Sequence, residues 1–317
     1  MKKCRSRRDF IRATCGAAGL FTAGSLIKLP NLFAQDSTTV ASGAAQSMLA
    51  IVEGPVEAAV RKAFDMFGGM SAFVHPGQTV LLKPNMSFPN PKTWGSDTSP
   101  ELVKTVALEA LQAGAARVIV ADNTMRKDTE SFDRSGLTEA LAGIDKVKIL
   151  PIQEESFFTE VAVPNGKALK TVMIAKLIQK ADVFINLPCA KSHSATDVSF
   201  GLKNSMGLIW DRGYFHTGTD LHTAIAELAT VIRPHLTILD ATRAMVTGGP
   251  TGPGKVQELN TIIAGTDPLA VDAYATTLVN WNNRSLKPNM VKHLLAASQI
   301  GVGEINLDKV NVRKETV

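Results

Sequence analysis

The sequence has little cysteine and few aromatic residues. Its 317 residues include three cysteines, and aromatic side chains make up 6% of the chain. Two of the cysteines, Cys4 and Cys15, lie in an N-terminal segment that we expect to be removed, which leaves Cys189. One cysteine excludes an intrachain disulfide framework, a self-contained cysteine-ligated iron–sulfur cluster and a cysteine-rich zinc site. We interpret Cys189 as a small buried residue at a strand end, with a nucleophilic thiol as the alternative.

The N-terminus carries an export pattern. Residues 6–12, SRRDFIR, contain paired arginines after three further basic residues, and a weakly hydrophobic stretch follows at 13–33. This is the pattern of a twin-arginine (Tat) signal peptide. We expect residues 1–34 to be that signal, cleaved after Ala34, and residues 35–47 to be a flexible linker. The alternatives are an uncleaved anchor and an amphipathic helix. The pattern predicts a periplasmic or exported protein that the Tat translocase carries.

A surplus of charge of one sign is also lacking once that signal is set aside. The full chain has 34 basic and 29 acidic residues and a net charge of +5. Seven of the basic residues and one acidic residue lie in the expected signal, so 27 basic and 28 acidic residues remain. No basic surplus is left to bind nucleic acid or a membrane surface. We expect no nucleic-acid partner, and a membrane contact only if the signal stays uncleaved.

The rest of the chain alternates short apolar runs with helical patterns. Continuous apolar runs are typical of strands that are buried on both faces of a parallel sheet. The expected strands are 50–52, 79–82, 117–121, 146–150, 182–187, 236–239, 259–264 and 309–313, and the expected helices are 56–67, 100–112, 137–141, 174–180, 198–208, 219–232, 268–278 and 290–298. The segments 159–163 and 168–172 flank a Pro-Asn-Gly turn and predict a β-hairpin. We therefore expect a single α/β domain over 48–317: a doubly wound, mostly parallel sheet with helices on both faces and a small β-hairpin insertion.

Polar side chains follow the ends of four expected strands. They are Lys83 and Asn85, Asp122 and Asn123, Lys191 and His193, and Asp240. The carboxyl ends of parallel strands lie at one edge of a sheet, so we expect these groups to share a cleft. The densest cluster is 181–209, ADVFINLPCAKSHSATDVSFGLKNSMGLI, in which Lys191 and His193 are expected on a loop and Lys203 and Asn204 on the following helix.

Several motifs in this order together resemble the DUF362 family. They are Lys-Pro-Asn after a strand, Lys-x-His after INLP, LKNxMG, LTILDATRAM with GGPTGPG, and GTDPLAVDA. The resemblance covers about residues 79–280 and implies an α/β fold. It places the family's pattern on Lys83, Asn85, Lys191, His193, Lys203, Asn204, Gly207, Asp240, Gly249, Asp267 and Asp272. Members often occur in iron–sulfur proteins, fused to ferredoxin-like modules, but this chain has no ferredoxin cysteine motif.

The cluster contains groups that suit an anion, because ammonium groups supply attraction and amides supply oriented donors. The expected ligand-binding residues are Lys83, Asn85, Asp122, Lys191, Asn204 and Gly249. Lys203 differs from the other lysines, since it lies in an otherwise apolar segment where an ammonium needs a partner, either Asp240 or a bound anion. A desolvated lysine has a lowered pKa and can act as a base or as a Schiff-base nucleophile.

Two kinds of function fit these residues. The first is an enzyme that acts on a small carboxylate or phosphate, alone or with a redox partner protein, with Lys203 or His193 as the acid–base group and Asp240 orienting it. The second is a non-catalytic periplasmic ligand-binding or accessory protein for an iron–sulfur or redox system. A metal site from His193, Asp240 and either His216 or His222 has no recognisable ligand spacing, so the identity of any metal or other cofactor is unknown.

Overall fold

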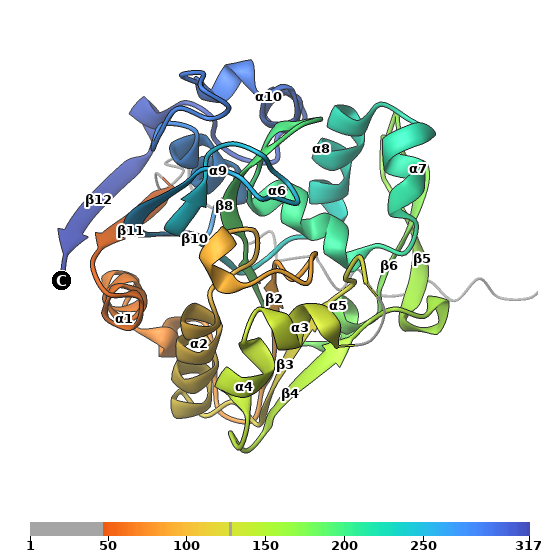
Figure 1. The fold of residues 1–317 in the computed structure, drawn as a ribbon. Helices are drawn as coiled ribbons and strands as arrows, with labels where there is room; N and C mark the ends of the chain where they lie inside the picture. Colours follow the sequence, from red (N-terminus) through yellow and green to blue (C-terminus); the bar gives the residue numbers. More distant parts are fainter. Residues whose placement is uncertain (1–46, 127–128) are drawn as a thin grey trace, which may run out of the picture. The chain divides into compact units, whose positions relative to one another are not determined.

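The computed structural model describes residues 47–126 and 129–317 (Figure 1). The expected signal peptide, and all of the expected linker except its last residue, lie outside the described residues. Within the described part, none of the helices has the length and hydrophobicity needed to cross a bilayer.

A central sheet runs in the order β12-β1-β11-β10-β7-β2-β3-β4. Its strands are β1 (Met48–Glu53), β2 (Thr79–Pro84), β3 (Arg117–Asp122), β4 (Val147–Pro151), β7 (Val183–Leu187), β10 (Leu236–Met245), β11 (Val256–Gly265) and β12 (Asn311–Thr316). β11 is antiparallel to both of its neighbours, and each other pair along this path is parallel. The structure confirms the predicted α/β fold with a mostly parallel sheet.

Helices cover both faces of the sheet (Figure 1). One face packs against α1 (Val56–Met66), α2 (Pro100–Gln112), α3 (Glu130–Arg134) and α4 (Leu137–Leu141). The other packs against α5 (Leu177–Lys180), α6 (Gly201–Asn204), α8 (Leu221–Val231), α9 (Pro268–Ala275) and α10 (Lys292–Gln299). Alternation along β2 illustrates the division, because Val80 and Leu82 belong to the first core and Leu81 to the second. Strands buried on both faces read as continuous apolar runs for this reason.

The strand that leads to the site continues beyond Pro188. β8 (Cys189–His193) begins directly after that proline and pairs with β10 between Asp240 and Met245. β9 (Asp197–Ser199) pairs with β8. Lys191 and His193 therefore lie on a strand, and the prediction of a loop was wrong. The reason is the length of β10, which extends ten residues and offers β8 a backbone partner that a local sequence pattern does not reveal.

The predicted hairpin is confirmed as β5 (Phe158–Ala162) and β6 (Thr171–Ala175), which form a separate two-stranded sheet. Glu227 on α8 fastens its connecting segment. The carboxylate accepts hydrogen bonds from the backbone N–H groups of residues 167–169, at distances of 2.5 to 3.2 Å. The insertion is thus anchored to the helix layer by one buried carboxylate.

The expected helix at 198–208 is broken into shorter pieces. Residues Ser205–Leu208 form a 3-10 turn after the four-residue α6, and β9 occupies the start of the range. The buried carboxylate of Asp272 sets where α6 begins, because its oxygens accept from the N–H groups of Gly201 (2.7 Å) and Leu202 (2.9 Å). The expected helix at 219–232 is likewise preceded by a separate helix, α7 (Arg212–Thr217).

Candidate functional site

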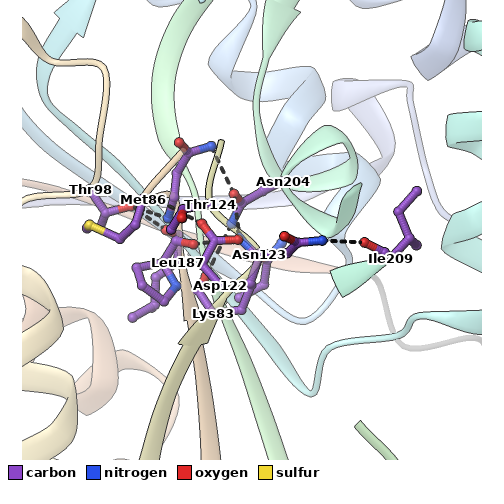
Figure 2. Close-up of polar contacts among 12 residues, drawn as sticks. Lys83, Met86, Thr98, Asp122, Asn123, Thr124, Leu187, Asn204 and Ile209 are labelled. Atoms are coloured by element: carbon purple, nitrogen blue, oxygen red, sulfur yellow. Dashed lines mark hydrogen bonds and ion pairs between the residues drawn. The ribbon is translucent and has the colours of Figure 1, made fainter. Parts of the chain in front are cut away.

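A buried ion pair lies where the ends of β2 and β3 meet (Figure 2). Lys83 Nζ is 2.9 Å from Asp122 Oδ1, and each side chain is 1% exposed. The same ammonium donates to Pro84 O (2.6 Å) and Asn204 Oδ1 (3.1 Å). Three acceptors use the three N–H groups of Lys83. The structure therefore gives Lys83 a role in the fold rather than the predicted contact with a ligand.

The carboxylate oxygens of Asp122 also have partners within the protein. Its second oxygen, Oδ2, accepts from the backbone N–H of Met86 at 2.7 Å. Gly207 covers the ion pair, and a Cβ at that position would lie 2.1 Å from Asp122 Oδ1 and 2.5 Å from Lys83 Cε. A glycine is required here for close approach, and the pair it covers belongs to the interior. Asp122, predicted to bind a ligand, instead neutralises Lys83.

A chain of hydrogen bonds extends from this pair to β8. Asn204 Oδ1 also accepts from Asn85 Nδ2 (3.0 Å), and Asn85 Oδ1 accepts from Lys191 Nζ (3.1 Å). Lys191 donates in addition to Ser96 O and lies 5.3 Å from the centre of the Phe88 ring. Residues from β2, β3, β8 and α6 are thereby brought together, as the strand-end argument predicts.

A cavity of about 610 Å³ opens beside this chain of hydrogen bonds. The volume is in the range of small-molecule sites, roughly 300–1,000 Å³. Its polar wall consists mainly of Asn85, Asn204, Lys191, Lys203, Arg212, His193 and His216, and its apolar wall of Phe88, Met125, Met206 and Trp210. Asp211 is the one carboxylate that the described residues contribute to this wall, and it caps α7 by accepting from the N–H of Tyr214 at 3.0 Å. We refer to this space as the cationic cavity.

Lys203 lies in the wall of the cationic cavity with 9% of its surface exposed. Its Nζ is 3.5 Å from the thioether sulfur of Met206, and no carboxylate of the described residues pairs with it. Burial lowers the pKa of Lys203 to about 7, and the positive charges of Lys191 and Arg212 act in the same direction. The prediction of a buried ammonium in an apolar segment is confirmed, and close to neutral pH a substantial fraction of Lys203 is a neutral amine.

His193 also lines the cavity and is 7% exposed. Its Nδ1 accepts from the backbone N–H of Ala195 at 3.0 Å, from which we assign the hydrogen to Nε2. Burial and then the charges of Lys203 and Lys191 lower the pKa of His193 to about 2. At neutral pH the ring is therefore an uncharged hydrogen-bond donor, which argues against its predicted acid–base role.

Asp240 serves a different purpose from the one predicted. Its Oδ2 accepts from the backbone N–H of Ser99 (2.7 Å), and its Oδ1 accepts from the N–H (3.0 Å) and hydroxyl (2.6 Å) of Thr242. It ties the start of α2 to β10 and is not part of the cavity wall. The prediction that Asp240 orients Lys203 is therefore wrong, because its oxygens are directed to other donors.

Gly249 packs against β8 at Ser192. Its N–H donates to Ser192 Oγ at 3.1 Å, and a Cβ at this position would lie 1.9 Å from Ser192 O. Its successors Pro250 and Thr251 do line the cavity. Gly249 thus allows the 248–254 loop to approach β8, and it is not itself part of the cavity wall.

Arg212 is a cavity residue that the sequence analysis missed. It begins α7, and its guanidinium donates to Asn123 O (2.5 Å) and Thr124 O (3.0 Å) at the end of β3. Those two carbonyl bonds orient the planar cation toward the cavity without neutralising it. The available signal was a basic residue directly after the helix-capping Asp211, in a stretch assigned to a connection.

The remaining candidates from the sequence are a metal site and the thiol of Cys189. Among the described residues, no group of three or more histidine, cysteine or acidic side chains is placed to hold a metal ion. Cys189 is 2% exposed and donates to Ser96 O at 3.2 Å, and burial raises the pKa of its thiol to about 12. The thiol stays protonated, which favours the structural interpretation of Cys189.

The chain is similar to one protein family and to several known proteins over most of its length. The family model described as "Domain of unknown function (DUF362)" matches residues 80–277. A thylakoid-associated protein of Synechocystis is 27% identical over 256 residues, which cover 78% of this chain and 76% of the relative. Two solved structures, a protein from Thermotoga maritima and the lactate racemase apoprotein from Thermoanaerobacterium thermosaccharolyticum, are each 13% identical over 70% of this chain, with TM-scores of 0.46 and 0.44. The match spans 59% and 55% of those two chains.

The family match covers more than half of the chain and includes the buried ion pair, β8, α6 and the 248–254 loop. The motif residues that line the cavity all lie within the matched range: Asn85, Lys191, His193, Lys203, Asn204 and Gly207. The chain belongs to the DUF362 family.

Proposed function

We propose that this protein is an enzyme that acts on a small anionic substrate, a carboxylate or a phosphate, in the cationic cavity. The observation that supports it most strongly is Lys203, a buried lysine in the cavity wall that has no carboxylate partner among residues 47–126 and 129–317. A buried ammonium that lacks a counter-ion is unfavourable, and a bound anion would relieve that penalty.

The other cations of the wall suit the same ligand. Lys191 has three N–H groups, and Ser96 O and Asn85 Oδ1 accept from two of them. The guanidinium of Arg212 keeps donors for a planar anion, because its bonds to protein go to neutral oxygens. The uncharged ring of His193 adds an N–H donor at Nε2. A pKa near neutrality suits Lys203 to accept and return a proton during a reaction.

We further propose that the protein works outside the cytoplasm, on the strength of the paired arginines at 7 and 8. Replacing both with lysine in the full-length chain should abolish its recovery from the periplasm of a Tat-competent host. Recovery equal to wild type would contradict export by that route.

The binding test is calorimetry with oxalate and with inorganic phosphate at low salt. Lys203→Met removes the charge and keeps a flexible apolar side chain beside Met206, and Lys148→Met removes an exposed charge on β4 as the matched control. We expect Lys203→Met to weaken binding of the preferred anion about tenfold or more, and Lys148→Met to bind as wild type. Equal binding by the folded Lys203→Met variant would exclude Lys203 as a ligand-binding residue.

Turnover separates an enzyme from a binding protein. Small carboxylates that bind are incubated with the protein in D₂O, and loss of the hydrogen next to the carboxylate is followed by proton NMR. An acid–base Lys203 should catalyse this exchange in wild type and not in Lys203→Met. Saturable binding without exchange or conversion of any tested compound would favour the non-catalytic binding protein.

A further inference from the structure

Three buried lysines lie close to the cavity, and they differ in what holds them. Lys83 has a carboxylate and two further oxygen acceptors, and Lys191 has two oxygen acceptors and the face of Phe88. Lys203 has only the weakly accepting thioether of Met206 among its described contacts. Of the three, Lys203 is the amine whose lone pair is least committed when it loses its proton.

The surroundings of Lys203 disfavour its charged form. The charges of Lys191 on β8 and Arg212 on α7 act on Lys203. The charge of Lys203 in turn acts on four imidazoles: His193 from β8, His216 from α7, His222 from α8 and His293 from α10. Within the described part of the chain, the titratable groups linked to Lys203 in this way are thus cations and imidazoles. Neighbouring cations and an apolar site are the arrangement that makes a lysine a nucleophile.

We propose that Lys203 forms an imine with the carbonyl carbon of a small oxo acid, such as glyoxylate or pyruvate, bound in the cationic cavity. This inference rests on the proposed function and names its substrate class. Arg212 and Lys191 supply positive charge for the carboxylate of such a molecule, and His193 supplies a neutral N–H for its carbonyl oxygen. A cavity of about 610 Å³ holds a molecule of this size with room for a larger substituent.

The step balances without any further reactant. The nitrogen lone pair of Lys203 forms a bond to the carbonyl carbon, and the electron pair of the C=O π bond moves to oxygen. Both hydrogens of the amine leave with that oxygen as water, which produces the C=N bond. The imine nitrogen then takes up one proton from solvent. The resulting positively charged imine withdraws electrons from the neighbouring carbon–hydrogen or carbon–carboxylate bond, so that either bond is weakened.

Borohydride trapping tests this directly on the full-length chain. Wild type is incubated with pyruvate, sodium borohydride is added, and peptide mass spectrometry locates any lysine that has gained pyruvate with loss of one water and addition of two hydrogens. We expect the modification at Lys203. Modification spread over exposed lysines, with Lys203 unmodified, would overturn the proposal.

Two variants make the test specific. Lys203→Arg keeps a positive charge in the wall but cannot form the imine, and Lys148→Arg makes the same change at an exposed site. Lys203→Arg should lose trapping and still bind pyruvate, whereas Lys148→Arg should be trapped as wild type. If Lys203→Arg fails to fold, the lysine that carries the trapped pyruvate in wild type decides between Lys203 and the exposed lysines.

The outcomes also separate this inference from the function on which it rests. Saturable pyruvate binding without a trapped Lys203 would refute the imine and leave the anion-binding cavity intact. Absence of both binding and trapping would refute the cavity as well. At pyruvate concentrations too low to saturate the cavity, the trapping rate reports the free protein. A buried lysine with a pKa of about 7 should then be trapped at a rate that levels off above about pH 8, whereas ordinary lysines continue to gain about tenfold per pH unit up to about pH 10. A trapping rate at Lys203 that continued to climb in that way would contradict the inference.

Discussion

The buried Lys83–Asp122 pair gives a quantitative prediction. Lys83→Met removes the ammonium that lies 2.9 Å from Asp122 Oδ1, at a place where both side chains are 1% exposed. Asp122 would keep a single backbone donor, the N–H of Met86, and Pro84 O would lose its side-chain donor. Removing one partner of a buried pair costs about 3–5 kcal/mol because a buried charge is left uncompensated. In a domain of this size each kcal/mol lowers Tm by about 2–4 °C, so we expect a fall of about 6–20 °C.

Urea titration followed by tryptophan fluorescence measures this loss. The matched control is Lys62→Met, because Lys62 lies 3.7 Å from Glu315 in an exposed pair and should contribute less than about 1 kcal/mol. Asp122→Asn and the double variant complete a double-mutant cycle. The double variant should lose less stability than the two single losses added together, by about 2 kcal/mol or more. A loss below about 1 kcal/mol for Lys83→Met, or strict additivity, would refute the reasoning.

Three further predictions follow from single positions. Gly207→Ala would place a Cβ 2.1 Å from Asp122 Oδ1 and should lower stability by about 1–3 kcal/mol in the same urea assay; an unchanged midpoint would contradict the close approach. Glu227→Gln weakens the acceptor for the N–H groups of residues 167–169, so hydrogen exchange of those amides should accelerate while β2 is unaffected; unchanged protection would show that the carboxylate does not anchor the segment. Burial lowers the pKa of His293 to about 3, whereas the unfolded side chain titrates near 6.5. Through this group, wild type should lose up to about 1.4 kcal/mol of stability for each pH unit below about 6.5. His293→Leu should flatten that dependence of stability on pH, and parallel profiles for the two proteins would contradict this role of His293.

The meeting of distant residues at one sheet edge could be predicted from the sequence. Apolar runs followed by Lys83, Asp122 and Lys191 imply parallel strands, and parallel strands bring their carboxyl ends together. The burial of Lys203 could also be predicted, because the residues around it in the chain are apolar.

The division of these groups between structure and ligand binding could not be predicted. Lys83 is neutralised by a residue 39 positions away, under a glycine whose closeness only the folded chain reveals. Asp240 follows an apolar run, as the cavity residues do, but its carboxylate oxygens accept hydrogen bonds from Ser99 and Thr242. Arg212 reaches the cavity from a short helix with no apolar periodicity, so the sequence carries little signal for it.

The most direct test of the account is the ionisation of Lys203, measured by NMR on protein with ¹³C-labelled lysine and assigned with Lys203→Arg. We predict a pKa of about 7 in the free protein, because burial and neighbouring cations disfavour the ammonium. Saturation with oxalate should raise that value, since a bound anion supplies the missing counter-charge. A free-protein pKa near the ordinary value of about 10.4, unchanged by oxalate, would contradict the cationic cavity as an anion site built around Lys203.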